Sequence, residues 1–171
     1  MIDFQQLAPS DAAFLSGIGG TSLLESHGHS APSEIMQEYV GTNLNREACR
    51  NELSDPKNIF YAIYHKNEAA GYFKIICKAD NPVVQLKPVT KLERLYLLKP
   101  FYGLNLGNLL LQKAVDLSKG CGDQGMWLNV WKENQRAIRF YQKKGFSAVG
   151  ETVFLLTATH ANPNWVMVLE Y

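Results

Sequence analysis

The fold of this chain is decided by residues 92–107, which read LERLYLLKPFYGLNLG. Residues 93–98 are rich in apolar and β-favouring side chains, so we expect a short strand there that Pro100 ends. Residues 102–107 then contain two glycines and an asparagine, the residue types that best tolerate positive φ. From Asn108 the apolar residues recur at helical spacing as far as Gly120, a residue suited to end a helix. The pattern predicts a strand, a tight loop and a helix.

The predicted loop lies directly before the first turn of this helix. Several backbone N–H groups would then point toward one spot, where the positive end of the helix dipole also lies. Such an arrangement binds a phosphate or pyrophosphate group. Glycine turns before helices are also common for purely structural reasons, so the loop by itself leaves both interpretations open.

Length and composition limit the class of protein. The 171 residues fit one domain, 1–171, and 46% hydrophobic with 19% charged residues is typical of a globular chain. A net charge of +1 without a basic run predicts no nucleic-acid partner, and no apolar run reaches the roughly 18 residues of a membrane span. Cys49, Cys77 and Cys121 are far apart and lack a CxxC spacing. We therefore expect reduced thiols, no metal site and a cytoplasmic location.

The first third of the chain predicts one strand and several irregular helices. Residues 2–7 have the strand pattern, and Ser10 is a candidate N-cap for the first helix. Glycines at positions 17, 19 and 20 are expected to weaken this helix, so that residues 21–25 continue it as a second piece. A second helix is expected from Pro32 to about residue 44, and Asn45 should cap a third.

The rest of the chain predicts a mixed sheet. Residues 58–78 read as an antiparallel hairpin, followed by a loop to about residue 90. Further strands are expected at 125–131, 146–156 and 165–170, with a polar loop at 157–164 and a helix capped by Asn134. Because the middle helix joins two strands, those strands should be parallel. The fold class is α/β (α+β), with helices on both faces of the sheet.

The order of these elements resembles the GNAT family of N-acetyltransferases. Two stretches carry the resemblance, LERLYLLKPFYGLNLGNLLL and WLNVWKENQRAIRFYQKKGF, and the second has Asn134, Tyr141 and Gly145-Phe146 at the spacing of the family. The chain is most similar to the PaiA-type spermine/spermidine acetyltransferases. The resemblance implies the GNAT fold, a mixed, mostly antiparallel sheet of about seven strands.

One part of the sequence departs from the family pattern. The phosphate loop of the family is usually Arg/Gln-x-x-Gly-x-Gly/Ala, whereas Tyr102 and Asn105 stand here at the first and fourth positions. Asparagine is the next best residue after glycine at positive φ, so we expect the loop to close. Most of the attraction for a pyrophosphate comes from backbone N–H groups and the helix dipole, which do not depend on these side chains.

The resemblance implies acetyl-CoA as co-substrate and assigns roles to particular residues. Backbone groups of the central strand would hold the pantetheine arm, the loop would hold the phosphates, and Tyr141 would protonate the leaving thiolate. The cofactor-binding residues would be Leu95, Tyr96, Leu97, Tyr102, Gly103, Leu104, Asn105, Leu106, Gly107, Asn108, Asn134 and Tyr141. Glu93 is the candidate base for an amine with a pKa of about 10, although it could also be a solvated residue at a strand end.

The acceptor remains open at this point. Glu25, Glu34 and Glu38 could bind a polyamine or form a charged outer helix face. His27 and His29 lie in a Gly/Ser-rich loop and most simply belong to the surface. We expect a small amine, such as a polyamine, as acceptor. The alternatives are a protein or peptide acceptor, a non-catalytic CoA-binding sensor and, more weakly, a nucleotide-binding α/β domain. A homodimer through the last strands is also left open.

Overall fold

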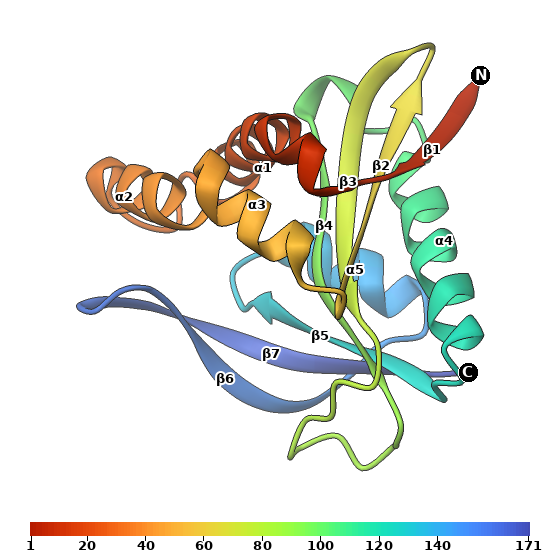
Figure 1. Cartoon of the computed structure of the whole chain (residues 1–171). Helices are drawn as coiled ribbons and strands as arrows, with labels where there is room; N and C mark the ends of the chain where they lie inside the picture. Colours follow the sequence, from red (N-terminus) through yellow and green to blue (C-terminus); the bar gives the residue numbers. More distant parts are fainter. The chain divides into compact units, whose positions relative to one another are not determined.

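The computed structural model describes residues 1–171 and contains five α-helices and seven strands. The strands form one sheet in the order β1-β2-β3-β4-β5-β7-β6 (Figure 1). Their bounds are β1 Ile2–Gln6, β2 Asn58–His65, β3 Glu68–Ile76, β4 Thr90–Leu97, β5 Gly125–Trp131, β6 Ser147–Thr157 and β7 His160–Glu170. The helices are α1 Ala12–His27, α2 Ser33–Asn43, α3 Arg46–Ser54, α4 Leu106–Gly120 and α5 Gln135–Lys143. None of these helices has the length and apolar character needed to cross a bilayer.

The chain divides into two compact units. The first contains residues 1–75 and 94–114, and the second contains residues 76–93 and 115–171. The predicted single domain of 1–171 stays a prediction. Each unit has its own polar network and is described by itself below.

In the first unit, helices cover both faces of the strands (Figure 1). On one face, Phe14 of α1 stacks on Tyr64 of β2, with ring centroids 6.2 Å apart. On the other face, Nζ of Lys113 in α4 lies 5.2 Å from the centroid of the Tyr61 ring. Successive side chains of a strand point to opposite faces, so Tyr61 and Tyr64 lie on opposite faces of β2. Helices α4 and α1, which contact them, therefore cover opposite faces of the strands. The expectation of helices on both faces is confirmed.

Helix α1 is continuous through its glycines, contrary to the prediction. A Cβ on Gly19 would lie 3.3 Å from the Tyr72 hydroxyl, and one on Gly20 would lie 3.2 Å from Val40. These glycines allow close packing, which outweighs their low helix propensity. Ser10 is also not the cap: it lies in a 3-10 turn, and the N-cap position of α1 is Asp11.

In the second unit, β4 and β5 are parallel and the last three strands are antiparallel. Thr90 pairs with Met126 and Lys91 with Trp127, which confirms the prediction of two parallel strands around the middle helix. Strand β7 pairs with both β5 and β6. It begins at His160, so most of the predicted polar loop at 157–164 is strand. Pairing across the hairpin therefore decided the conformation of residues whose local sequence favours a loop.

The expectation of three reduced thiols is wrong for two of the cysteines. Cys77 directly follows β3, Cys121 directly follows α4, and the two form a disulfide across a sequence separation of 44. Cys49 is a buried free thiol. The fold brings the end of β3 next to the end of α4, and the spacing of the two cysteines in the sequence did not indicate that they pair.

Asp123 organises the polar network beside this disulfide. Its Oδ2 accepts hydrogen bonds from the Lys78 backbone N–H at 2.9 Å and from the Thr90 hydroxyl at 2.5 Å. The Ser118 hydroxyl donates to Thr90 Oγ1, and the Tyr171 hydroxyl donates to Ser118 Oγ, each at 2.7 Å. One carboxylate thus joins the start of β4, the end of α4 and the last residue of the chain.

Candidate active site

The loop between β4 and α4 has the backbone that the sequence predicts. Gly103 has φ +82° and Asn105 has φ +62°, so one glycine and the asparagine adopt the positive φ that these residue types tolerate, while Gly107 lies in α4. Helix α4 then begins at Leu106, two residues earlier than predicted, with the Leu106 side chain buried. The Asn108 side-chain amide donates to the Asn105 side-chain oxygen. The loop therefore leads directly into a helix N-terminus, whose first N–H groups have no partner within the helix.

The edge of β4 that faces away from β3 carries the Leu97 N–H. The neighbouring Leu98 N–H donates to the Ala70 carbonyl of β3 at 2.8 Å. Successive N–H groups of a strand point to opposite edges, so the Leu97 N–H points away from β3. Gly71 lets the two strands approach, because a Cβ at this position would clash with the Tyr96 carbonyl.

His27 lies at the end of α1 beside β4. Its ring meets the Tyr96 ring edge-on, with centroids 5.8 Å apart. The Ser26 hydroxyl donates to the Ser22 carbonyl at 2.8 Å and lies 2.7 Å from His27 Nδ1. Burial of the ring, and after it the charge of His29, lower the pKa of His27 from 6.5 to about 4.

The acidic residues of the helical region have different surroundings. Glu25 Oε2 accepts the Lys99 backbone N–H at 2.7 Å and so connects α1 to the turn after β4. Glu34 and Glu38 are exposed on α2. A structural role therefore accounts for Glu25, whereas the carboxylates of Glu34 and Glu38 are solvated.

In the second unit, Glu93 forms an ion pair on its own strand. Glu93 Oε1 lies 3.2 Å from Nζ of Lys91, and both side chains are half-buried. The same Lys91 ammonium lies 5.2 Å from the centroid of the Trp127 ring. Trp127 itself packs in a core with Val84, Val89 and Val166, as expected for a structural residue. Glu93 is thus held in a defined position rather than fully solvated at a strand end.

Asn134 and Tyr141 are positioned by α5. Asn134 Oδ1 accepts the Ala137 N–H at 3.1 Å, which confirms its predicted role as N-cap. Tyr141 lies two residues before the last residue of α5 and is 9% exposed. Its ring meets the Phe140 and Phe146 rings at centroid distances of 5.2 and 5.4 Å. Aromatic packing thus fixes the direction of the Tyr141 side chain.

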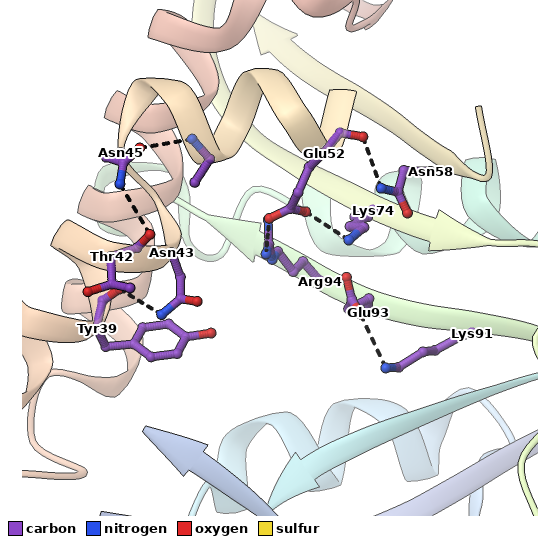
Figure 2. A network of polar contacts seen from close by, with 11 residues as sticks. Tyr39, Thr42, Asn43, Asn45, Glu52, Asn58, Lys74, Lys91, Glu93 and Arg94 are labelled. Carbon is purple, nitrogen blue, oxygen red and sulfur yellow. Dashed lines mark hydrogen bonds and ion pairs between the residues drawn. The ribbon is translucent and has the colours of Figure 1, made fainter. Parts of the chain in front are cut away.

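The sequence did not point to a network of charged residues around Glu52. Figure 2 shows the Glu52 carboxylate of α3 between Lys74 of β3 and Arg94 of β4. Glu52 Oε2 lies 2.7 Å from Lys74 Nζ, and Glu52 Oε1 lies 2.8 Å from Arg94 Nη2. Asn58 donates to the Glu52 backbone carbonyl at 2.9 Å. One carboxylate therefore fastens α3 to two neighbouring strands.

One signal for this network was present in the sequence. Lys74 interrupts the apolar run AAGYFKII, and lysines are almost never buried unless they are paired. A carboxylate partner for Lys74 could therefore be expected. Glu52 could not be identified as that partner, because it is 22 residues away and on a different kind of element.

Comparison with known proteins identifies the family. Residues 22–146 match the model of the acetyltransferase (GNAT) family. An uncharacterized N-acetyltransferase of Mycobacterium tuberculosis (strain ATCC 25618 / H37Rv) is 34% identical over 140 residues, 82% of this chain and 84% of that protein. The chain belongs to the GNAT acetyltransferase family. An uncharacterized N-acetyltransferase of Lactobacillus delbrueckii subsp. lactis is also similar, at 28% identity over 152 residues, 88% of this chain and 87% of that protein.

The fold of this GNAT protein has a solved counterpart. PaiA N-acetyltransferase from Thermoplasma acidophilum, in complex with coenzyme A, matches with a TM-score of 0.79 at 19% identity over 100% of this chain and 99% of that one. The GCN5-related N-acetyltransferase structure from Rhodopseudomonas palustris matches with a TM-score of 0.76 at 15% identity, over 99% and 95% of the two chains. At these identities the likeness shows the fold, and the predicted GNAT fold is confirmed.

Family membership makes the chain an acyltransferase of the N-acetyltransferase type, with acetyl-CoA as co-substrate. These predictions are confirmed. The roles of individual residues and the identity of the acceptor stay predictions.

Proposed function

We propose that this enzyme transfers the acetyl group of acetyl-CoA to a primary amine of a small molecule, by direct transfer in a ternary complex. The observation that supports this most is the loop at Gly103 and Asn105, where two positive φ angles lead into the N-terminus of α4. The loop has the backbone of a pyrophosphate site although its side chains depart from the usual family pattern. In this proposal, residues 102–108 hold the phosphates of acetyl-CoA.

The edge of β4 supplies the remaining backbone contacts. The pantetheine arm carries amide groups that pair with the backbone of a strand. Residues 95–97 provide this backbone, beyond the pairs that β4 forms with β5 at Thr90 and Lys91. The Leu97 N–H, directed away from β3, donates to the oxygen of the tetrahedral intermediate. Asn134 contacts the cofactor in addition to capping α5.

The proton transfers use two side chains. Glu93 takes a proton from the ammonium form of the acceptor, directly or through water, because only the neutral amine is nucleophilic. The amine then attacks the thioester carbonyl carbon, the nitrogen of the intermediate gives its extra proton to solvent, and the intermediate collapses to the amide with loss of the CoA thiolate. The Tyr141 hydroxyl protonates this thiolate. Aromatic packing supports the role of Tyr141 by fixing its direction, and the Lys91 ion pair does so for Glu93.

The cysteines favour direct transfer over an acetyl-enzyme. A nucleophilic cysteine needs a low pKa and access to substrate. Burial raises the pKa of the Cys49 thiol, and Cys77 and Cys121 are joined to each other. None of the three therefore has the surroundings of an acetyl-accepting thiolate.

Polyamines are the first acceptor class that we propose to test. The sequence resembles the PaiA-type enzymes, and Glu34 and Glu38 are exposed carboxylates that could attract a polycation. Glu25 is excluded from this set because it holds the Lys99 N–H. A peptide or protein N-terminus is the alternative acceptor.

Location and assembly complete the proposal. We place the reaction in the cytoplasm, where acetyl-CoA is available, and fractionation of the producing cell tests this. We also propose a homodimer through the last strands. Strand β6 ends the sheet and carries Val153 and Leu155, which are 63% and 64% exposed. Light scattering of the purified protein tests the dimer.

The activity is tested by measuring thiol release from acetyl-CoA. The acceptors are spermidine, spermine, a panel of amino acids and a panel of peptides. Tyr141→Phe should lower kcat by about 100-fold or more, because it removes the proposed acid and keeps the ring. Tyr171→Phe is the matched control: its hydroxyl bonds Ser118, so its loss should affect stability and leave kcat unchanged.

Each outcome assigns the acceptor or changes the proposal. Release with a polyamine that falls in Tyr141→Phe supports the substrate class and the acid. Release with peptides alone keeps the enzyme and discards the polyamine. Binding of acetyl-CoA by calorimetry without release from any acceptor would instead support a CoA-binding sensor, which the departures at Tyr102 and Asn105 make worth testing.

A further inference from the structure

The disulfide encloses the segment that we assign to acetyl-CoA. The chain leaves the bridge at Cys77, passes through β4, the loop at 102–108 and α4, and returns at Cys121. Oxidation of the pair therefore closes a covalent ring around the whole strand–loop–helix segment. A ring of this length removes much of the conformational freedom of the unfolded chain.

Hydrogen bonds also hold together the segments that follow Cys77 and Cys121. Beside Cys77, the Lys78 N–H donates to Asp123 Oδ2 at 2.9 Å, two residues beyond Cys121. The Ala79 N–H donates to the Val89 carbonyl at 2.8 Å and closes the intervening loop. Trp127 Nε1 donates to the Ala79 carbonyl at 2.6 Å. These bonds do not involve sulfur, so the two thiols should remain neighbours when the bridge is reduced.

The three cysteines differ in access to small molecules. Cys77 and Cys121 are half-buried, whereas Cys49 is fully buried. A small thiol or disulfide can therefore reach the pair more easily than it can reach Cys49. Cys49 provides an internal control for any thiol chemistry of the folded protein.

We propose that Cys77 and Cys121 are a reversible oxidation site that fastens the acetyl-CoA-binding segment. The oxidant is a low-molecular-weight disulfide, such as oxidised glutathione. One cysteine thiolate attacks it, which forms a mixed disulfide and releases one small thiolate. The second cysteine thiolate then displaces the other small thiolate and forms the protein disulfide. Two cysteine thiols lose two electrons and two protons, and one small disulfide becomes two small thiols. Bridges of this kind in proteins of reducing compartments are usually transient or redox-sensing.

Oxidation should raise stability, and it should also tighten coenzyme A binding. The first effect follows from the closed ring alone and amounts to a rise in Tm of about 10 °C. The second effect rests on the proposed function. A segment whose two ends are already fastened loses less freedom when the cofactor orders it, so we expect a several-fold lower Kd for coenzyme A in the oxidised form.

The experiment compares the full chain after oxidised glutathione and after dithiothreitol. Thiol titration in denaturant, peptide mass mapping, Tm and calorimetry with coenzyme A are measured on both forms. We expect one thiol and a linked Cys77–Cys121 peptide after oxidation, and three thiols with a lower Tm after reduction. Cys49→Ser should keep the redox shift in Tm, and Cys77→Ser and Cys121→Ser should each abolish it.

The outcomes separate this inference from the proposed function. Three thiols after oxidation, or the same Tm in both forms, would overturn the oxidation site. A shift in Tm with equal Kd values would overturn its effect on the cofactor. Failure of both forms to bind coenzyme A would refute the proposed binding segment, while the thiol counts and Tm would still decide whether the oxidation site exists.

Discussion

Two carboxylates organise the polar interiors of the two units in different ways. Glu52 in the first unit bonds two cationic side chains, Lys74 and Arg94 (Figure 2). Asp123 in the second unit accepts hydrogen bonds from a backbone N–H and a hydroxyl, and its Oδ1 is buried without a hydrogen-bond partner. The first network depends on opposite charges, and the second depends on the geometry of uncharged donors.

This difference determines which substitutions each network can tolerate. A buried cation that loses its carboxylate keeps a charge in a poorly solvated place, which is strongly destabilising. A hydroxyl or amide that loses a carboxylate partner can still donate to a neutral oxygen of the same shape. A neutral isostere should therefore affect Glu52 much more than Asp123.

The largest predicted effect is at Glu52. Glu52→Gln should lower the free energy of unfolding by about 3 kcal/mol, because Lys74 is buried and loses the negative charge that it bonds. Urea denaturation measures this change. Glu47→Gln, an exposed position on the same helix, is the control and should be nearly neutral. Combining Glu52→Gln with Lys74→Met should recover part of the loss, and a double variant as unstable as the single one would contradict the charge argument.

The second prediction concerns His27 of the first unit, whose burial disfavours the protonated imidazole. The pKa of His27 is lowered to about 4, so the unfolded chain binds a proton between about pH 6.5 and 4 that the folded protein does not bind. Stability should therefore fall as pH falls through this window, by about 3 kcal/mol in total. Thermal unfolding between pH 7 and 4 measures it. His27→Gln should flatten the profile and His160→Gln should not, and an unchanged slope in His27→Gln would place the titrating group elsewhere.

A smaller effect is predicted for the second unit. Asp123→Asn should lower the free energy of unfolding by about 1 kcal/mol, since one amide oxygen can still accept from Lys78 or Thr90. Urea denaturation beside Glu52→Gln makes the comparison direct. Asp80→Asn, an exposed aspartate in the same unit, is the control. If Asp123→Asn destabilises as much as Glu52→Gln, the proposed distinction between the two networks fails.

The smallest predicted effects come from two equivalent helix caps, one in each unit. Asn45 accepts the Ala48 N–H at 2.8 Å and Asn134 accepts the Ala137 N–H at 3.1 Å. Replacing either by alanine should lower the free energy of unfolding by about 1 kcal/mol. Only Asn134→Ala should also raise the KM for acetyl-CoA, because we assign a cofactor contact to Asn134 alone. Steady-state kinetics of both variants decide whether Asn134 is more than a cap.

The comparison also explains which predictions from the sequence were successful. Strand β5, the β2–β3 hairpin and the caps Asn45 and Asn134 were predicted because each follows from neighbouring residues. The continuity of α1 was missed, since it depends on packing of Gly19 and Gly20 against Tyr72 and Val40. The start of β7 was missed because pairing with β6 outweighs the local preference for a loop.

The candidate site divides in the same way. The loop at 102–108 and the positions of Asn134 and Tyr141 followed from motifs within single stretches of the chain. The ion pair of Glu93 with Lys91 and the contact of His27 with Tyr96 did not, because they depend on side-chain directions and on packing between elements.

The sequence by itself determined the family, the order of the elements and the conformation of the loop at 102–108, because spacing, turn residues and caps act over a few residues. The tertiary structure decided the partners of Glu52 and Asp123 and the pairing of Cys77 with Cys121. Glu52 and Lys74 are 22 residues apart, Asp123 and Thr90 are 33 apart, and the two cysteines are 44 apart. At such separations many carboxylates, cations and thiols are equivalent in the sequence, and only the packing of helices on strands selects the pairs that meet.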